Sequence, residues 1–179
     1  ERREVVATYI DPHCSPYELS QIMAEAGRSW ARGRSQMLIG WEVNGAGAAI
    51  HKDLQRLHYP AIWKSKRGRY GWLSTRQSKR ELYGGLARAI ADATIVIPDG
   101  EILDEMETTI VYDNGGIGPA RLEVDRSSGA AEAHGDRVVA MALAVLMCET
   151  ASGASDRNEP ETGLPDFSAK TILKMDEII

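Results

Sequence analysis

The chain has 179 residues, of which 43% are hydrophobic and 26% charged, enough for one domain with a core and a tail. No apolar run reaches the roughly 18 residues that a membrane-spanning helix needs. The first residues, ERREVV, are charged, so we expect no signal peptide. Cys14 and Cys148 fit no metal-ligand spacing, which favours a reducing compartment.

The net charge of −5 argues weakly against a nucleic-acid partner, but the charge is unevenly distributed. Residues 51–90 hold ten Lys and Arg against two Asp and Glu, whereas residues 91–179 hold six against eighteen. Such asymmetry indicates a basic surface on an otherwise acidic protein. Charge alone leaves the alternative of solvated helix faces and a loop.

The first half of the chain alternates strand and helix patterns. Residues 4–10 predict a strand, and Ser15-Pro16 opens a helix that Gly33 ends. Residues 36–43 form a compact apolar run typical of a buried strand. The turn at 44–47 then leads into a helix that stops before Pro60. A short strand at 62–63 and the basic loop KSKRGRYG follow.

In the second half, Ser74 or Thr75 caps a predicted helix over 76–92, with Leu82, Leu86 and Ile90 on one face. A strand over 94–98, a segment 101–112 that starts helical, and a hairpin turn at 113–116 come next. The helix predicted over 136–150 is apolar on more than one stripe, which indicates burial.

The order of these elements predicts an α/β domain with a largely parallel sheet over residues 1–151. Residues 152–179 are predicted to be a disordered tail, because 151–166 are rich in Ser, Gly, Pro and acidic residues. A short apolar stretch at 167–179 could dock on a partner, although a frayed terminus is the simpler explanation.

Glu42 is the first candidate for chemistry, because it ends an apolar strand. A carboxylate buried there must be paired, hydrated or bound to a metal. Asn44, Gly45 and Gly47 follow as a tight turn that leaves room for a ligand, and Asn44 is a possible auxiliary residue. The structural alternative is a strand-end Glu that caps a helix or pairs with an Arg.

Asp136 is the second candidate, at the start of the last predicted helix. Its place at a helix N-terminus is itself a sufficient explanation. Beside Glu42, however, it could hold Mg²⁺ at one edge of the sheet, and His134 is a possible third ligand or proton shuttle. The chain contains no phosphate-binding loop of the GxxxxGK[ST] type, and GxSxG, HExxH and CxxC are also absent.

Three segments, in order, resemble the nuclease domain of the large terminase subunit of tailed bacteriophages, the motor that packages and cuts viral DNA. WEVNGAGAAIHKDLQRLHYPAIW is similar to the family's strand ending in an acid, its Asn-Gly turn and its Tyr-Pro. GWLSTRQSKRELYGGLARAI is similar to the following segment, and AHGDRVVAMALA to the closing motif. The resemblance covers about residues 1–150.

The resemblance implies an RNase H-like fold, a mixed sheet flanked by helices, and an endonuclease with two Mg²⁺ or Mn²⁺ ions. Glu42 matches the family's second acidic ligand and Asp136 its third, while Gly135 stands where many members carry an extra Asp. The family's first catalytic Asp lies on an upstream strand, so we expect this chain to lack the domain's first strands and that Asp. Asp11 is in the wrong place to replace it. We also expect the ATPase domain that precedes the nuclease in this family to be missing.

The resemblance implies double-stranded DNA as substrate, the portal and the small terminase subunit as partners, and the cytoplasm of a bacterial host as the location, with no membrane. For phosphate contacts we expect the basic residues Lys64, Lys66, Arg67, Arg69 and Lys79. Without the first Asp, the chain is expected to cut DNA slowly or not at all. The alternatives are a catalytically impaired fragment, a DNA-binding or assembly module on the same fold, and another RNase H-like nuclease such as a resolvase or transposase.

Overall fold

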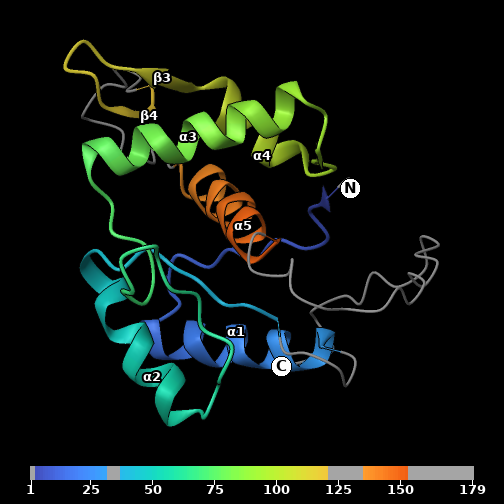
Figure 1. The fold of residues 1–179 in the computed structure, drawn as a ribbon, viewed down its shortest axis with the longest axis vertical. Coiled ribbons are helices and arrows are strands. Elements are labelled where there is room, and N and C mark those ends of the chain that lie inside the picture. Colours follow the sequence, from blue (N-terminus) through green and yellow to red (C-terminus); the bar gives the residue numbers. More distant parts are fainter. Residues whose placement is uncertain (1–2, 32–36, 121–134, 153–179) are drawn as a thin grey trace.

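The computed structural model describes residues 3–31, 37–120 and 135–152, which form a mixed α/β domain (Figure 1). In this part of the chain the helices are α1 Pro16–Trp30, α2 Ile50–Arg56, α3 Arg76–Ala91, α4 Gly100–Glu107 and α5 Asp136–Ser152. A 3-10 helix, Gly45–Ala49, precedes α2. The α/β class is therefore confirmed. His134 and the predicted tail from residue 153 onward lie outside the described residues.

The helices begin where side chains can satisfy their free N–H groups. Ser15 and Glu18 form a capping box at α1, with Pro16 in the first turn, as the sequence predicts. Thr75 caps α3, and Ser78 completes its capping box. Asp99 caps α4 by accepting from the amides of Glu101 and Ile102. These local bonds fix the helix starts independently of tertiary packing.

In the described residues, one parallel strand pair, one antiparallel hairpin and isolated bridges stand where a longer sheet was predicted. Strand β1, Arg3–Glu4, pairs with β2, Ile95–Val96, in parallel. Strands β3, Thr109–Val111, and β4, Ile117–Pro119, form an antiparallel hairpin across the predicted turn at 113–116, with the second strand starting earlier than the predicted 120–124. The prediction of a strand over 4–10 is wrong beyond its start. The described chain places no strand beside residues 6–10, and Val6 and Ile10 are exposed.

The predicted strand 36–43 is an extended segment, residues 39–43, that pairs in parallel through isolated bridges. Ile39 pairs with Ile62, and Glu42 pairs with Trp72. The backbone N–H and C=O groups of Ile39, Trp41 and Val43 that make these bonds all lie on one edge of the segment. Residues 61–63 therefore pair with the first part of that edge and residues 71–72 with the second part. The segment lies between α5 and the α1–α2 pair (Figure 1).

Side chains alternate along the 39–43 segment and divide the core in two. Ile39, Trp41 and Val43 belong to a cluster with α1 and α2, which includes Leu54 and Tyr59. Gly40 instead faces the other layer, where a Cβ would strike the Met147 sulfur. That second cluster joins Trp63 and Trp72 to α3, α4 and α5. Helices therefore cover both faces of the paired segments.

Helix α5 is the central element of the second cluster, as its apolar pattern predicts. Val138, Met141, Ala142, Leu143 and Val145 are buried, and α5 packs most extensively on α3. On α3, Leu82 and Leu86 are buried as predicted, but Ile90 is exposed and Ala89 takes the core position. Among the described helices none combines the length and apolarity that crossing a bilayer requires.

Candidate functional site

Glu42 lies on the α3–α5 side of the extended segment, opposite to Trp41 and Val43. It is half-buried, lies next to the last residue of the segment and pairs with Trp72. The next residue but one, Asn44, holds the neighbouring loop through its amide. Its oxygen accepts from the Ser74 amide at 2.7 Å, and its nitrogen donates to the Ser74 carbonyl at 3.1 Å. Asn44 thereby fixes the start of α3 against the end of the Glu42 segment.

Asp136 is exposed at the first position of α5, and its helix start is anchored by α4. The Glu105 carboxylate accepts from the backbone amides of Arg137 at 3.0 Å and Val138 at 3.3 Å. It also pairs with the Arg137 guanidinium at 2.7 Å, and Glu101 binds the other end of that guanidinium. The hydrogen bond to Glu105, more than the nearby carboxylate charges, raises the pKa of Arg137. A carboxylate on another helix thus caps α5 and neutralises its dipole.

Both candidate carboxylates, Glu42 and Asp136, affect the pKa of Tyr83 on α3. Burial of this half-buried side chain raises its pKa, and the charges of Glu105, Glu42 and Asp136 raise it further, in that order. The charges of these three carboxylates therefore all act on the Tyr83 hydroxyl. They come from an extended segment, from α4 and from α5. We call Glu42, Tyr83, Glu105 and Asp136 the acidic site.

Lys79 stands at the border of the acidic site. It precedes Tyr83 by four residues on α3, so the two side chains share one face of the helix. Lys79 is half-buried, unlike Arg76 and Arg80 on the same helix, which are exposed. A cation in this position can offset the carboxylates and contact a bound phosphate.

The acidic site offers carboxylate oxygens, which are the ligands that Mg²⁺ and Mn²⁺ prefer. Within residues 3–31, 37–120 and 135–152, however, no three His, Cys, Asp or Glu side chains come together as a metal-holding group. Glu105 is engaged by Arg137 and by the α5 amides. The donor chemistry therefore fits a divalent cation through Glu42 and Asp136, but these two ligands alone make an incomplete site.

The predicted basic loop is a tight hairpin-like turn. Lys64 and Tyr70 pair in antiparallel fashion, the Ser65 amide donates to Arg69 at 2.8 Å, and Gly68 has a φ of 76°. A left-handed residue at this place is typical of a short hairpin turn and suits glycine. Four cations of the turn are exposed, and in the described structure no ion-pair partner neutralises them: Lys64, Lys66, Arg67 and Arg69. We call residues 64–70 the basic turn.

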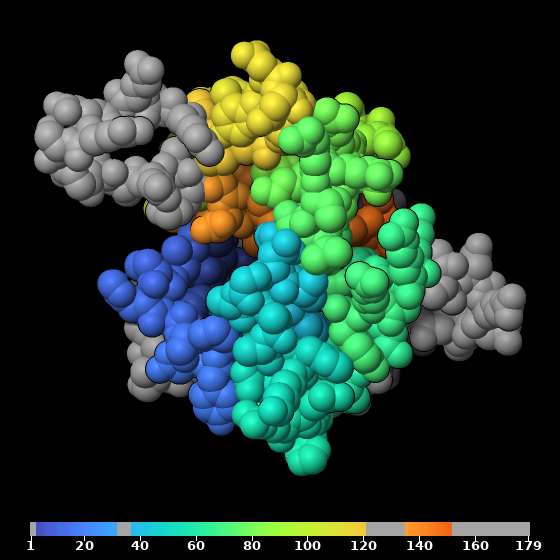
Figure 2. Space-filling view, turned by 90° about the vertical axis from the view of Figure 1, so that its left-hand side faces the viewer, coloured from blue at the N-terminus to red at the C-terminus, as the bar shows by residue number. Residues whose placement is uncertain are grey.

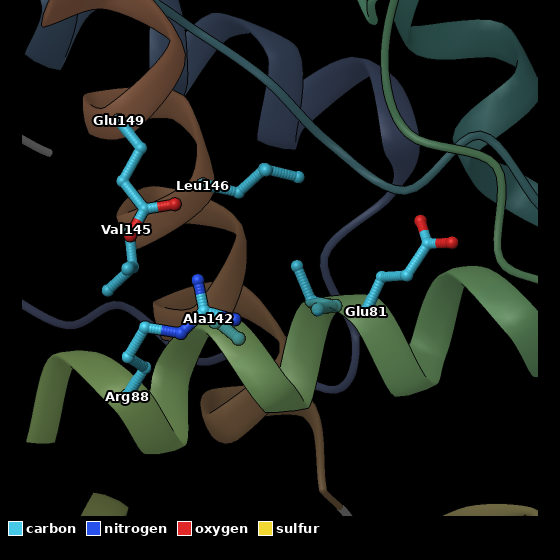
Figure 3. A pocket seen from close by; sticks show the side chains of 8 residues that line it. Glu81, Arg88, Ala142, Val145, Leu146 and Glu149 are labelled. Atoms are coloured by element: carbon cyan, nitrogen blue, oxygen red, sulfur yellow. The ribbon is translucent and has the colours of Figure 1, made fainter. Parts of the chain in front are cut away.

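A pocket between α3 and α5 lies apart from these residues (Figure 3). Its floor is apolar, formed by Ala142, Val145 and Leu146 with Leu82, and Glu81, Arg88 and Glu149 stand around it. Neither Glu42 nor Asp136 lines it. The pocket therefore does not correspond to the site that the sequence predicts.

Sequence reasoning missed Tyr83 and Glu105. Tyr83 has no signal of its own, because it sits beside Leu82 in an amphipathic helix and looks like a core aromatic. Glu105 lies in an acidic helix, where a carboxylate is usually solvated. Its partner is Arg137, 32 residues later, and that pairing depends on how α4 docks on α5.

Comparison of the chain with protein-family models, with curated proteins and with solved structures found no match.

A titration tests the geometry of the acidic site without any assay of activity. Glu42→Gln and Asp136→Asn should each lower the pKa of Tyr83 toward the ordinary tyrosine range, because each removes a negative charge that opposes tyrosinate formation. NMR of tyrosine labelled with ¹³C at Cζ measures this pKa, and Tyr83→Phe identifies the resonance. Glu107→Gln, an exposed change of the same charge on α4, should leave it unchanged. A Tyr83 pKa that ignores both substitutions would place those carboxylates elsewhere.

Proposed function

We propose that this chain is the nuclease domain of the large terminase subunit of a tailed bacteriophage. In this proposal it has an RNase H-like fold and cuts concatemeric viral double-stranded DNA during genome packaging. The observation that supports the proposal is that the charges of Glu105, Glu42 and Asp136 all raise the pKa of the same half-buried residue, Tyr83. Glu42 and Asp136 are also the residues that match the acidic motifs of that family.

The order of the elements supports the proposal. Glu42 ends an extended segment that has helices on both faces, and Asp136 begins the helix that packs behind it. A divalent metal, Mg²⁺ or Mn²⁺, would supply an activated water and stabilise the leaving oxygen of a phosphodiester. Glu42 and Asp136 offer it oxygen ligands, and Lys79 offers a cation to the substrate's phosphate.

The basic turn supplies the second half of the proposal, which is DNA binding. Its four exposed cations would contact phosphates of the duplex, which position the nucleic acid without reading its sequence. The proposed setting is the cytoplasm of a bacterial host, with the portal and the small terminase subunit as partners. Each of these expectations follows from the family resemblance.

A DNA-binding or assembly module on the same fold, catalytically impaired, is the second candidate. Two observations on the described residues favour it. No group of three metal-binding side chains forms among them, and the four cations of the basic turn are exposed. Such a module would bind DNA with a steep salt dependence and leave the backbone intact.

Plasmid nicking with Mn²⁺ separates the two candidates. The chain should nick supercoiled DNA slowly, and Glu42→Gln or Asp136→Asn should reduce nicking to background because each removes a metal ligand. Glu107→Gln is the matched control and should nick like the parent chain. In parallel, Mn²⁺ should raise the melting temperature of the parent chain and of the control, but not of the two site variants.

The outcomes are distinct. Nicking that persists in both site variants would contradict the assigned ligands. DNA binding that weakens with salt, without nicking and without thermal stabilisation by Mn²⁺, would support the second candidate.

A further inference from the structure

Three aromatic rings stack beneath the basic turn. Trp41 of the extended segment lies 6.3 Å from His51 of α2, between ring centroids, and His51 lies 4.1 Å from Tyr70 at the end of the turn. The interplanar angles are 18° and 23°. Trp41 is buried and donates its indole N–H to the Gly47 carbonyl at 2.9 Å. The stack therefore has a fixed inner end and one outer ring, Tyr70.

Tyr70 is 38% exposed, and a lysine ammonium lies over its outer face. His51 occupies one face of the ring at stacking distance, so the Lys64 ammonium, 4.7 Å from the ring centroid, lies over the other. Lys64 is an exposed, flexible side chain that another group can displace. Two residues beyond Tyr70, Trp72 pairs with Glu42, so the turn leads directly to the acidic site. Figure 2 shows the face on which α2 and the segment after it lie side by side.

We propose that Tyr70 is a stacking platform for one unpaired nucleobase of single-stranded DNA, whose backbone lies along the basic turn. The inference deepens the proposed function and rests on it, because it identifies the form of DNA that this surface prefers. Aromatic rings inside a positive groove bind single strands by stacking on the bases, whatever their sequence. A cation over an exposed ring is held more weakly than a stacked base. A base therefore displaces the Lys64 ammonium, which then contacts a phosphate.

The number of bases follows from the same geometry. His51 fills the inner face of Tyr70, so the ring offers a single free face and accepts one base. The neighbouring cations at Lys66, Arg67 and Arg69 then contact the phosphates on either side. Duplex DNA, whose bases are stacked on each other, gains only these phosphate contacts. The surface thus distinguishes a nicked or frayed end from an intact duplex.

Binding of fluorescent oligonucleotides tests the platform. The parent chain should bind oligothymidylate about 5- to 150-fold more tightly than an abasic strand of the same length and charge, as one stacked base predicts. Tyr70→Ala should abolish this preference and leave the affinity for the abasic strand unchanged. Tyr70→Phe should retain it. Tyr17→Ala, which removes an exposed tyrosine on α1, should behave like the parent chain.

Equal melting temperatures would show that all variants are folded. Tyr70→Phe keeps the stacked ring, so it tests stacking in a variant with little change to the structure. Equal affinity of the parent chain for both strands, or a preference that survives Tyr70→Ala, would overturn the platform. Tighter binding of oligouridylate than of oligothymidylate would overturn the assignment to DNA. A base preference without plasmid nicking contradicts only the nuclease proposal, and nicking without a base preference contradicts only the platform.

Discussion

Replacing Gly47 with alanine should unfold or strongly destabilise the protein, although it adds a single methyl group. A Cβ at this position would overlap the backbone carbonyl oxygen of Glu42, which cannot move without breaking the pairing with Trp72. Overpacking of this kind costs about 1–3 kcal/mol and sometimes more, and the upper end is expected because the obstacle is backbone. Urea unfolding monitored by tryptophan fluorescence measures the loss.

Gly84→Ala is the matched control for this substitution. Gly84 lies in the middle of α3, and among the described residues no atom beyond its chain neighbours and its own helix backbone lies within 4 Å of the Cβ it would gain. The same chemical change should therefore stabilise the protein by about 0.5–1 kcal/mol, because alanine is the better helix former. If both substitutions had equal effects, the close approach of Gly47 to Glu42 would be refuted.

Ile102→Ala should cost about 2–5 kcal/mol, since it empties a position that is almost fully buried between α4 and α5. Its neighbour Leu103 is 43% exposed, and Leu103→Ala should cost well under 1 kcal/mol. The two variants remove similar apolar groups from adjacent residues of one helix. Denaturant midpoints at constant slope measure the difference. Similar losses at the two positions would mean that α4 does not dock on α5 as described.

The α4 comparison also probes the acidic site, because α4 carries Glu105. If Ile102→Ala loosens the docking of α4, the carboxylate cap on α5 weakens with it. The start of α5 then frays, and Asp136 loses its fixed position. Stability and the pKa of Tyr83 should consequently both change in Ile102→Ala, and neither should change appreciably in Leu103→Ala.

Local chemistry made much of the fold predictable from the sequence. The starts of α1 and α3, the buried character of α5 and the β3–β4 hairpin follow from capping boxes, apolar periodicity and turn residues. Each of these signals acts over a few residues. The strand over 4–10 was predicted too long because a strand also needs a neighbour, and pairing is not a local property. Ile90 was misplaced for a related reason, since α5 lies against Ala89.

The candidate site was predictable only in part. Glu42 and Asp136 were identified because they end and begin elements. Tyr83 and Glu105 became visible only when α3, α4 and α5 were packed together. The cations of the basic turn were predictable from composition, but the stack beneath them was not. Trp41, His51 and Tyr70 have no common spacing, and only the fold brings their rings into contact.

The alternation along residues 39–43 has a consequence for insertions and deletions. Odd positions supply the core against α1 and α2, while Gly40 and Glu42 face α5 and the acidic site. Because side chains alternate between the two faces of an extended segment, adding or removing one residue within it would reverse which side chains face which layer. Trp41 would then point toward the acidic site, and the Glu42 carboxylate would point into the core against α1 and α2. Changes of length are therefore far less tolerable here than at the open tip of the basic turn, where Gly68 has free space around it.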